Sequence, residues 1–149
     1  MAATKTWKQK LEIKKDRKIV PIPEGMRKQC GGVDGTLLIP RPLDVDAAIR
    51  KIPAGRLMTM SELRANLARK FGATTTCPLC AGMFVRIAAE AAEEAAAPGE
   101  DPKTPYWRVV RDDGGLNPKL PGGGAAQARR LRREGHSISA AGKLRVLQS

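Results

Sequence analysis

The side chains best suited to covalent or metal chemistry in this chain are three cysteines and one histidine: Cys30, Cys77, Cys80 and His136. Cys77 and Cys80 are separated by two residues, a spacing that occurs in zinc sites and in redox helices. A closed zinc site needs about four ligands, and Cys30 and His136 are distant from the pair and from each other. The βαβ context of a redox motif is absent. We therefore expect free thiols, no metal and no cofactor.

A second candidate for function is the aromatic segment from Thr104 to Val110, with the letters T-P-Y-W-R-V-V. The glycine run 122–124 follows it, and then comes an arginine-rich helix that ends at Glu134. Tyr106 and Trp107 suit a protein core, but aromatic rings also stack on nucleic-acid bases. At this point both interpretations are open.

Composition directs attention to an anionic partner. The 149 residues carry a formal net charge of +12, and aromatic residues make up only 3%. Such an excess of positive charge favours nucleic acid first and an anionic membrane surface second. No apolar run of about 18 residues predicts a membrane span, and the N-terminal letters show no apolar signal core. We expect one domain in the cytoplasm, associated with the nucleoid and not with a membrane.

The first 36 residues differ in character from the rest. They are polar and rich in turn-forming residues, and from Lys5 to Lys28 there are nine Lys or Arg residues against three acids. We predict a basic N-terminal arm at residues 1–36, either a partly ordered tail or a segment that follows a phosphate backbone. These two descriptions are compatible. Residues 37–149 form the predicted domain.

Periodicity and capping signals define the elements of that domain. Asp44 suits an N-cap, Thr59 and Glu62 form a capping box, and Gly72 suits the end of a helix. Leu79 and Met83 begin an apolar series that continues with Ile87, every four residues. Helices are therefore predicted at about 44–51, 59–72, 78–97 and 125–134, and strands at 36–39, 106–110, 137–139 and 143–147.

The second and third of these helices, joined by a short threonine-rich turn, form a helix-turn-helix pattern. The helix from Pro78 is the candidate recognition helix. It begins with small residues, among them Cys80, Ala81 and Gly82. These would let the backbone approach a groove of DNA, and they would equally suit close packing of helices.

Three short patches resemble one known family. The letters P-Y-W-R-V at 105–109 are similar to the P-C-H-R-V strand of the alkylguanine-DNA alkyltransferases (methylated-DNA–protein cysteine methyltransferases). Residues 52–59 resemble that family's I-P-x-G-x-V-x-T entry to its helix-turn-helix, and the last helix ends in its E-G-H. The resemblance extends from about Ile49 to His136. It implies a winged helix-turn-helix DNA-binding domain in which a terminal hairpin forms the wing.

The same resemblance implies that the family's chemistry is missing. The acceptor cysteine falls on Tyr106, its histidine base on Trp107, and the carboxylate that orients the histidine near Ala128. A thiolate nucleophile needs such partners at neutral pH, so we expect no alkyl transfer. The chain is closest in type to the non-catalytic alkyltransferase-like proteins, but it departs from them as well. The arginine with which they enter the duplex falls at Pro78 or Leu79.

The sequence thus predicts a mainly α protein with small β elements, a winged helix-turn-helix-like domain with a basic N-terminal arm. Its expected function is non-enzymatic DNA binding, related to DNA repair or to the nucleoid, with double-stranded DNA as partner to a monomer. The alternative is an RNA- or ribosome-associated basic protein. The predicted nucleic-acid-binding residues are Met60, Ser61, Arg64, Thr75, Thr76, Cys80, Ala81, Arg86, Tyr106, Trp107, Arg108, Arg129 and Arg130.

Overall fold

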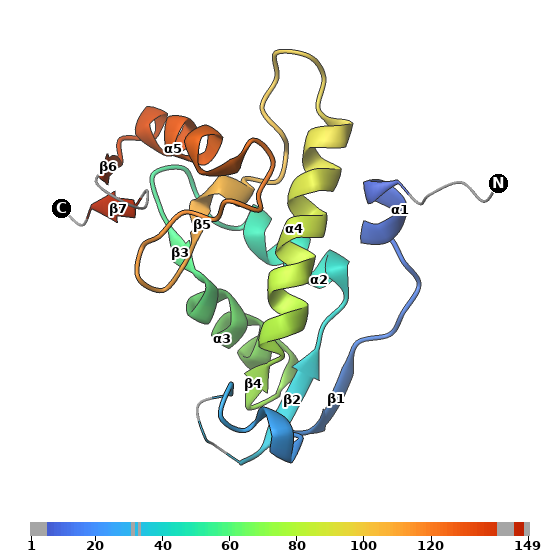
Figure 1. Ribbon diagram of the computed structural model, residues 1–149. Coiled ribbons are helices and arrows are strands. Elements are labelled where there is room, and N and C mark those ends of the chain that lie inside the picture. Colours follow the sequence, from blue (N-terminus) through green and yellow to red (C-terminus); the bar gives the residue numbers. More distant parts are fainter. Residues whose placement is uncertain (1–5, 31, 33, 140–144, 148–149) are drawn as a thin grey trace.

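The computed structural model describes residues 6–30, 32, 34–139 and 145–147. This part of the chain is mainly helical, with three small sheets (Figure 1). The helices are α1 Trp7–Leu11, α2 Pro42–Arg50, α3 Met60–Phe71, α4 Pro78–Ala95 and α5 Gly123–Arg133, with 3-10 turns η1 Glu24–Met26 and η2 Tyr106–Arg108. The strands are β1 Lys18–Pro21, β2 Thr36–Ile39, β3 Met58–Thr59, β4 Thr75–Thr76, β5 Val109–Val110, β6 Ser137–Ser139 and β7 Arg145–Leu147.

Helix α4 runs through the middle of the molecule, with α1, α2 and α3 beside it (Figure 1). Its buried face is made of Ala81, Val85, Ala88 and Ala89, each at most 2% exposed. Alanine lets neighbouring helices approach closely, which explains why the face with small side chains is buried and the face with Leu79 and Met83 is not. The predicted helix is therefore confirmed, but the four-residue series that begins at Leu79 is not its buried face.

Both ends of α3 are built as the sequence predicts. The Thr59 hydroxyl accepts a hydrogen bond from the Glu62 backbone, and the Glu62 side chain accepts one from Thr59 in return. The helix ends at Gly72, which has a φ of 77°. This left-handed conformation is easy for glycine and costly for other residues. Strand β4 then pairs in parallel with β2 before α4 begins.

The predicted N-cap at Asp44 is wrong by three residues. Helix α2 begins at Pro42, a residue well suited to the first helical position, so Arg41 is the N-cap. The Asp44 carboxylate accepts hydrogen bonds from the backbone and guanidinium of Arg41 and from the guanidinium of Arg17. Burial alone would raise the pKa of Asp44, but these hydrogen bonds outweigh burial and hold the pKa well below its usual range.

The predicted strand at 106–110 is also corrected. Tyr106–Arg108 forms a 3-10 turn, and only Val109–Val110 is a strand, paired in parallel with β3. Every residue of the segment except Arg108 is buried, and a short, mostly apolar run of this kind has no periodicity that separates strand from turn. The Gln127 side-chain amide donates to the carbonyl oxygens of Trp107 and Val109, which satisfies backbone groups that a longer strand would have paired.

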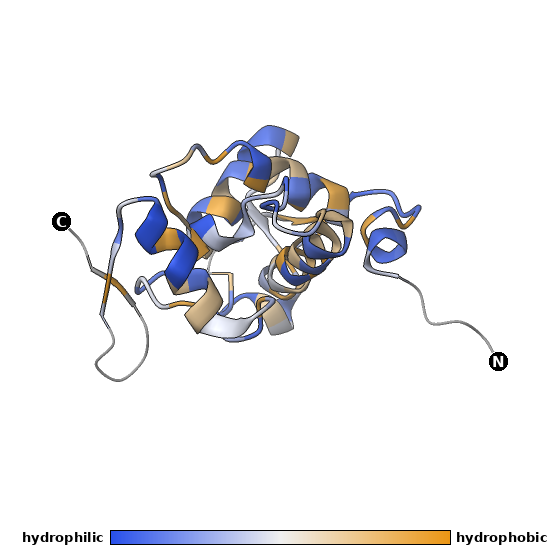
Figure 2. Cartoon of the chain, turned by 90° about the horizontal axis from the view of Figure 1, so that it is seen from above, coloured by the Kyte–Doolittle hydropathy of each residue, from blue (hydrophilic) through white to orange (hydrophobic). Residues whose placement is uncertain are grey.

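The described part of the basic N-terminal segment, from Thr6 onward, lies against the body of the protein. Strand β1 pairs antiparallel with β2, which links residues on both sides of the predicted boundary at residue 36. Helix α1 rests on α4, where the Glu94 carboxylate accepts hydrogen bonds from the backbone of Trp7 and Lys8. In Figure 2, which looks down from above, this helix is at the edge of the molecule next to the N-terminus.

At the other end of the chain, β6 and β7 form an antiparallel pair beside α5. This agrees with the predicted hairpin, although the turn at 140–142 and the start of the second predicted strand at 143–144 lie outside the described residues. Helix α5 begins at Gly123, two residues before the predicted start. No helix in the described part of the chain is both long and apolar enough to cross a bilayer.

Candidate nucleic-acid interface

The thirteen predicted binding residues differ widely in exposure. Ser61, Arg86 and Arg129 are exposed, whereas Met60, Arg64, Thr75, Cys80, Arg108 and Arg130 are half-buried. The remaining four are buried: Thr76, Ala81, Tyr106 and Trp107 are each at most 4% exposed. Side chains buried to this degree cannot reach a ligand at the surface as the protein stands.

Most of the residues fall into two groups at different heights along α4. One group, with Arg64, Thr76 and Cys80, surrounds the start of α4, and the other surrounds η2 and α5 near its end (Figure 1). Met60 and Ser61 belong to neither group, because they follow β3, which pairs with β5. From Cys80 to Glu93 the helix rises roughly 20 Å, at about 1.5 Å per residue. A ligand that touched both groups would have to span that distance.

The first group is held together by Arg64. Its guanidinium donates to the Thr76 carbonyl oxygen at 2.9 Å and to the Thr75 hydroxyl at 3.3 Å, and the Thr76 hydroxyl donates back to the Arg64 carbonyl oxygen at 2.7 Å. These three bonds fix the angle between α3 and α4. Ser61, at the start of α3, donates its backbone and hydroxyl hydrogens to Asp112. These two polar side chains serve the fold directly.

Ala81 is one of the small residues at the start of α4 that could serve either approach to a groove or close helix packing. Its side chain is fully buried against the core, so at this position the small residue serves helix packing. Gly82 has the opposite environment, because it is exposed and a Cβ atom added there would meet nothing within 4 Å. The start of α4 therefore has one closely packed face and one open face.

The second group centres on Tyr106. Its hydroxyl donates to the Glu93 carboxylate at 2.6 Å and accepts from the Arg130 guanidinium at 2.9 Å. Burial, and to a smaller extent the hydrogen bond to Glu93, raises the pKa of Tyr106 well above its usual value. The phenol therefore stays protonated at neutral pH. A buried, protonated phenol with both neighbours engaged is a structural group and a poor nucleophile.

Glu134 joins the neighbouring residues of η2. Its carboxylate accepts a hydrogen bond from the Trp107 indole at 3.0 Å and lies 2.8 Å from the Arg108 guanidinium. Arg108 also donates to the Ile52 carbonyl oxygen at 2.7 Å. Burial would raise the pKa of Glu134, but the hydrogen bonds from Arg108 and Trp107 lower it. Arg108 thus supports the fold through its contacts with Glu134 and Ile52.

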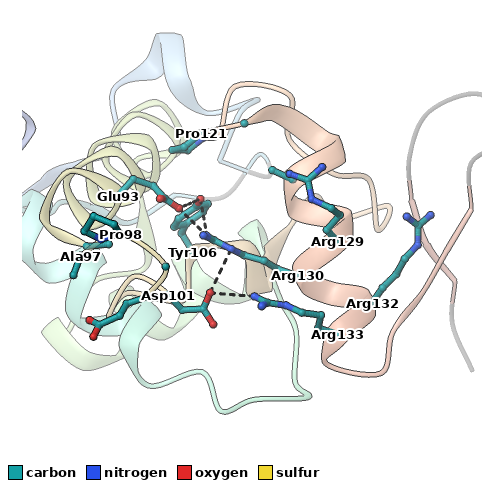
Figure 3. A pocket seen from close by; sticks show the side chains of 15 residues that line it. Glu93, Ala97, Pro98, Asp101, Tyr106, Pro121, Arg129, Arg130, Arg132 and Arg133 are labelled. Carbon is teal, nitrogen blue, oxygen red and sulfur yellow. Dashed lines mark hydrogen bonds and ion pairs between the residues drawn. The ribbon is translucent and has the colours of Figure 1, made fainter.

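The four arginines of α5 divide into two pairs. Arg130 binds Glu93 at 2.8 Å, and Arg133 binds Asp101 at 3.1 Å. Arg129 and Arg132 are exposed and make no ion pair within the described residues. Figure 3 shows them pointing away from the paired charges. Two unneutralised guanidinium groups one turn apart can hold phosphate oxygens.

These arginines border a cavity of about 970 Å³ between α4, the loop at 96–101 and α5. Tyr106 and Arg130 form part of its wall, and Pro121 and Gly122 another part. Gly122 is required by its position, because its φ is 77° and an added Cβ would lie 2.6 Å from the Ala126 Cβ. The glycine run therefore sets where α5 begins, and so where its arginines lie.

The three cysteines lie together at the other end of α4. Cys30 and Cys77 are buried in one small cluster, and half-buried Cys80 packs against it. All three are free thiols. Burial, and to a smaller extent contact with Cys77, raises the pKa of Cys80 to about 12. The Cys80 thiol is therefore unreactive at neutral pH. Among the described residues no group of three or more His, Cys, Asp or Glu side chains could hold a metal ion.

No protein-family model matches the chain, and no curated protein matches it significantly. Two solved structures are similar to it. One is S. pombe Atl1 in complex with damaged DNA containing O6-carboxymethylguanine, with 22% identity and a TM-score of 0.47 over 71% of this chain and 87% of that chain. The other is S. pombe ATL in complex with DNA, with 21% identity and a TM-score of 0.44 over the same shares. Because both scores lie below 0.5, the functional proposal rests on residues of this chain.

Sequence reasoning missed two features of the surface. Arg132 is exposed, like Arg129, but lies outside the predicted set, because the helical spacing of 129, 130, 132 and 133 does not tell which two find acidic partners. Leu79 and Met83 are exposed, although they belong to the apolar series that recurs every four residues along the predicted helix. The competing series Ala81, Val85 and Ala88 was the available signal, since it also recurs at helical spacing.

Proposed function

We propose that the protein binds double-stranded DNA without catalysing a reaction, as a monomer of the alkyltransferase-like type. In this proposal α3 and α4 act as a helix-turn-helix, β6 and β7 act as its wing, and residues 1–36 add a basic arm. Most of the affinity comes from phosphate contacts. The proposed setting is the cytoplasm, on the nucleoid, in DNA repair or in the organisation of DNA.

The observation that supports this most is the start of α4. Three hydrogen bonds between Arg64 and the turn at Thr75 and Thr76 hold α4 rigidly against α3, and its open face begins directly after that turn. A rigid helix start that faces solvent is what a groove reader requires. The net charge of +12 and the free pair Arg129 and Arg132 supply the attraction to phosphate.

The proposed absence of alkyl transfer is supported by the residue that the resemblance aligns with the acceptor cysteine. That residue, Tyr106, is a buried phenol bound by Glu93 and Arg130. The three thiols cluster at the start of α4, whereas Tyr106 binds Glu93 near its end. Burial and contact with Cys77 raise the pKa of Cys80, the one thiol of the three that is not fully buried. We expect that incubation with a duplex carrying a labelled O6-methylguanine leaves no label on Cys30, Cys77 or Cys80. Label on any of these cysteines would contradict the proposal.

DNA binding is tested by fluorescence anisotropy with a labelled duplex of about 20 base pairs at low salt, followed by a salt titration. We expect binding whose affinity falls steeply with salt, by about −0.9 in log–log slope for each phosphate contacted. Unlabelled duplex DNA and a structured RNA of the same length then compete for the protein. If the RNA displaces the duplex at much lower concentration, the alternative of an RNA- or ribosome-associated protein replaces this proposal.

A further inference from the structure

Helix α4 begins with an exposed apolar pair. Leu79 is 65% exposed and Met83 is 57% exposed, and they are among the most exposed large apolar side chains in the described part of the chain. They are four residues apart, so they lie side by side on one face of the helix. Exposed Gly82 lies next to them, and exposed Arg86 follows one turn later. The face therefore has an apolar tip with a cation behind it.

The fold does not bury Leu79 or Met83, whereas the Arg86 guanidinium behind them lies 5.8 Å from the centre of the Trp7 ring of α1. The opposite face, with Ala81 and Val85, is the one buried against the rest of the protein. Two side chains also expose far less than the ~800 Å² that each partner contributes to a standard protein–protein interface. A second copy of the chain or a folded protein partner would therefore gain little from this pair alone.

The charges around the pair favour a polyanion. From Pro78 to Ala89, α4 carries Arg86 and no acidic residue, and its acids appear only from Glu90 onward. Two of those acids are occupied inside the fold, because Glu93 binds Tyr106 and Arg130 while Glu94 caps α1. The Arg64 guanidinium adds positive charge at the turn just before the helix.

We propose that Leu79 and Met83 form an apolar wedge that enters the base stack of a DNA duplex, so that the protein prefers duplexes whose stacking is already interrupted. This inference rests on the proposed binding of duplex DNA. Leu and Met cannot hydrogen-bond to base edges, but such side chains in DNA-binding proteins slip between base pairs and partly unstack them. The unstacking cost is smallest at a mismatch or an abasic site. Those lesions are therefore the class of site that the wedge selects.

The test compares three duplexes of identical length in anisotropy titrations: an intact duplex, one with a central abasic analogue, and one with a central mismatch. We expect the unmodified protein to bind the abasic duplex on the order of tenfold more tightly than the intact one. The double variant Leu79→Ala, Met83→Ala should bind both with affinities within about twofold of each other. Its salt dependence should be unchanged, because no charge is removed.

Leu43→Ala is the matched control, since Leu43 is an exposed leucine, 38% exposed, on the surface of α2. It should keep the preference for interrupted duplexes. Equal affinity of the unmodified protein for intact and abasic duplexes would overturn the wedge but leave duplex binding standing, and so would a double variant that keeps the preference. A loss of dimer mass in the double variant, measured by sedimentation, would assign the pair to an interface between copies. Failure to bind any duplex at low salt would overturn both proposals.

Discussion

Glu134 connects more of the candidate site than any of its neighbours does. It accepts hydrogen bonds from Trp107 and Arg108, which occupy two consecutive positions of η2, and it lies at the end of α5. The side chains of Arg108 and Glu134 are 14% and 15% exposed. Removal of one partner from a pair this deep leaves the other charge poorly solvated, and this costs more than the loss of a surface pair.

Glu134→Gln should therefore lower the free energy of unfolding by about 2 to 3 kcal/mol at pH 7. Because the folded-state pKa of Glu134 is lowered, its contribution is full above the unfolded value of about 4.3 and is lost as the pH falls below it. Urea unfolding at several pH values should show the difference between the two proteins shrinking from pH 6 to pH 3.5.

Two further measurements test the role of Glu134. The emission of Trp107 should change in Glu134→Gln, since its indole loses a charged hydrogen-bond acceptor. Glu100→Gln, at an exposed loop position, is the control and should change neither stability nor emission. A difference between Glu134→Gln and the unmodified protein that stays constant down to pH 3.5 would show that the ion pair with Arg108 is not the source of the effect.

At the scale of elements, α5 depends on one glycine. Gly122→Ala would place a Cβ atom 2.6 Å from that of Ala126 and force alanine into a φ of 77°. We expect it to lower the free energy of unfolding by at least ~1–2 kcal/mol. Gly82→Ala, in the interior of α4 with open space around it, should be neutral or stabilising by up to about 1 kcal/mol. Thermal unfolding of both variants checks the contrast, and equal effects would contradict it.

The arginines of α5 make a second prediction at this scale. If Arg129 and Arg132 each contact a phosphate, replacing both with alanine should reduce the salt slope of DNA binding by about 1.8. Arg130→Ala should leave that slope nearly unchanged and instead lower stability, because it frees Glu93 and the Tyr106 hydroxyl from their partner. The two variants are compared by anisotropy in a salt series and by urea unfolding. If Arg130→Ala changed the salt slope and the Arg129 and Arg132 double variant changed only the stability, the paired and free arginines would exchange roles on binding.

At the scale of the whole molecule, the basic N-terminal segment has a double effect. Deleting residues 1–17 removes six basic and two acidic residues, but it also removes α1 from α4 and the Arg17 partner of Asp44. We therefore expect the deletion to lower both the salt slope and the free energy of unfolding. Lys14→Gln with Lys15→Gln, at two exposed positions, should lower the slope alone. A deletion that leaves stability unchanged would show that the contacts of α1 are energetically negligible.

Local signals predicted the helices well, because helix caps and turns depend on residues that are close together in the sequence. The capping box at Thr59 and the left-handed Gly72 follow from chemistry within four residues and are confirmed. The 3-10 turn at Tyr106 could not be predicted this way, since it depends on Gln127, which lies about twenty residues away and supplies hydrogen bonds to the Trp107 and Val109 carbonyls. The docking of α1 likewise depends on Glu94.

The candidate site was harder to predict than the fold for a related reason. Charge and resemblance supplied the segments from which the candidate residues come, and the structure brings Tyr106, Arg108 and Arg130 together around Trp107. Charge and resemblance could not indicate which arginines lack an acidic partner, because the acidic partners lie on other helices and loops. Glu93 and Glu134 neutralise the arginines nearest the aromatic segment, while Arg132 finds no acid among the described residues.

The hydrogen bonds from α1 to Glu94 also bear on the order in which the chain folds. Trp7 precedes Glu94 by 87 residues, so during synthesis the first helix emerges long before the residue that caps it. A five-residue helix does not form alone in water, and it must wait as an unstructured basic tail until α4 is complete. Amide hydrogens of α1 should therefore exchange with solvent far faster than those of α3, as hydrogen-exchange mass spectrometry can measure. Helix α1, which is synthesised before α4, should therefore fold after α4 and detach before α3 unfolds.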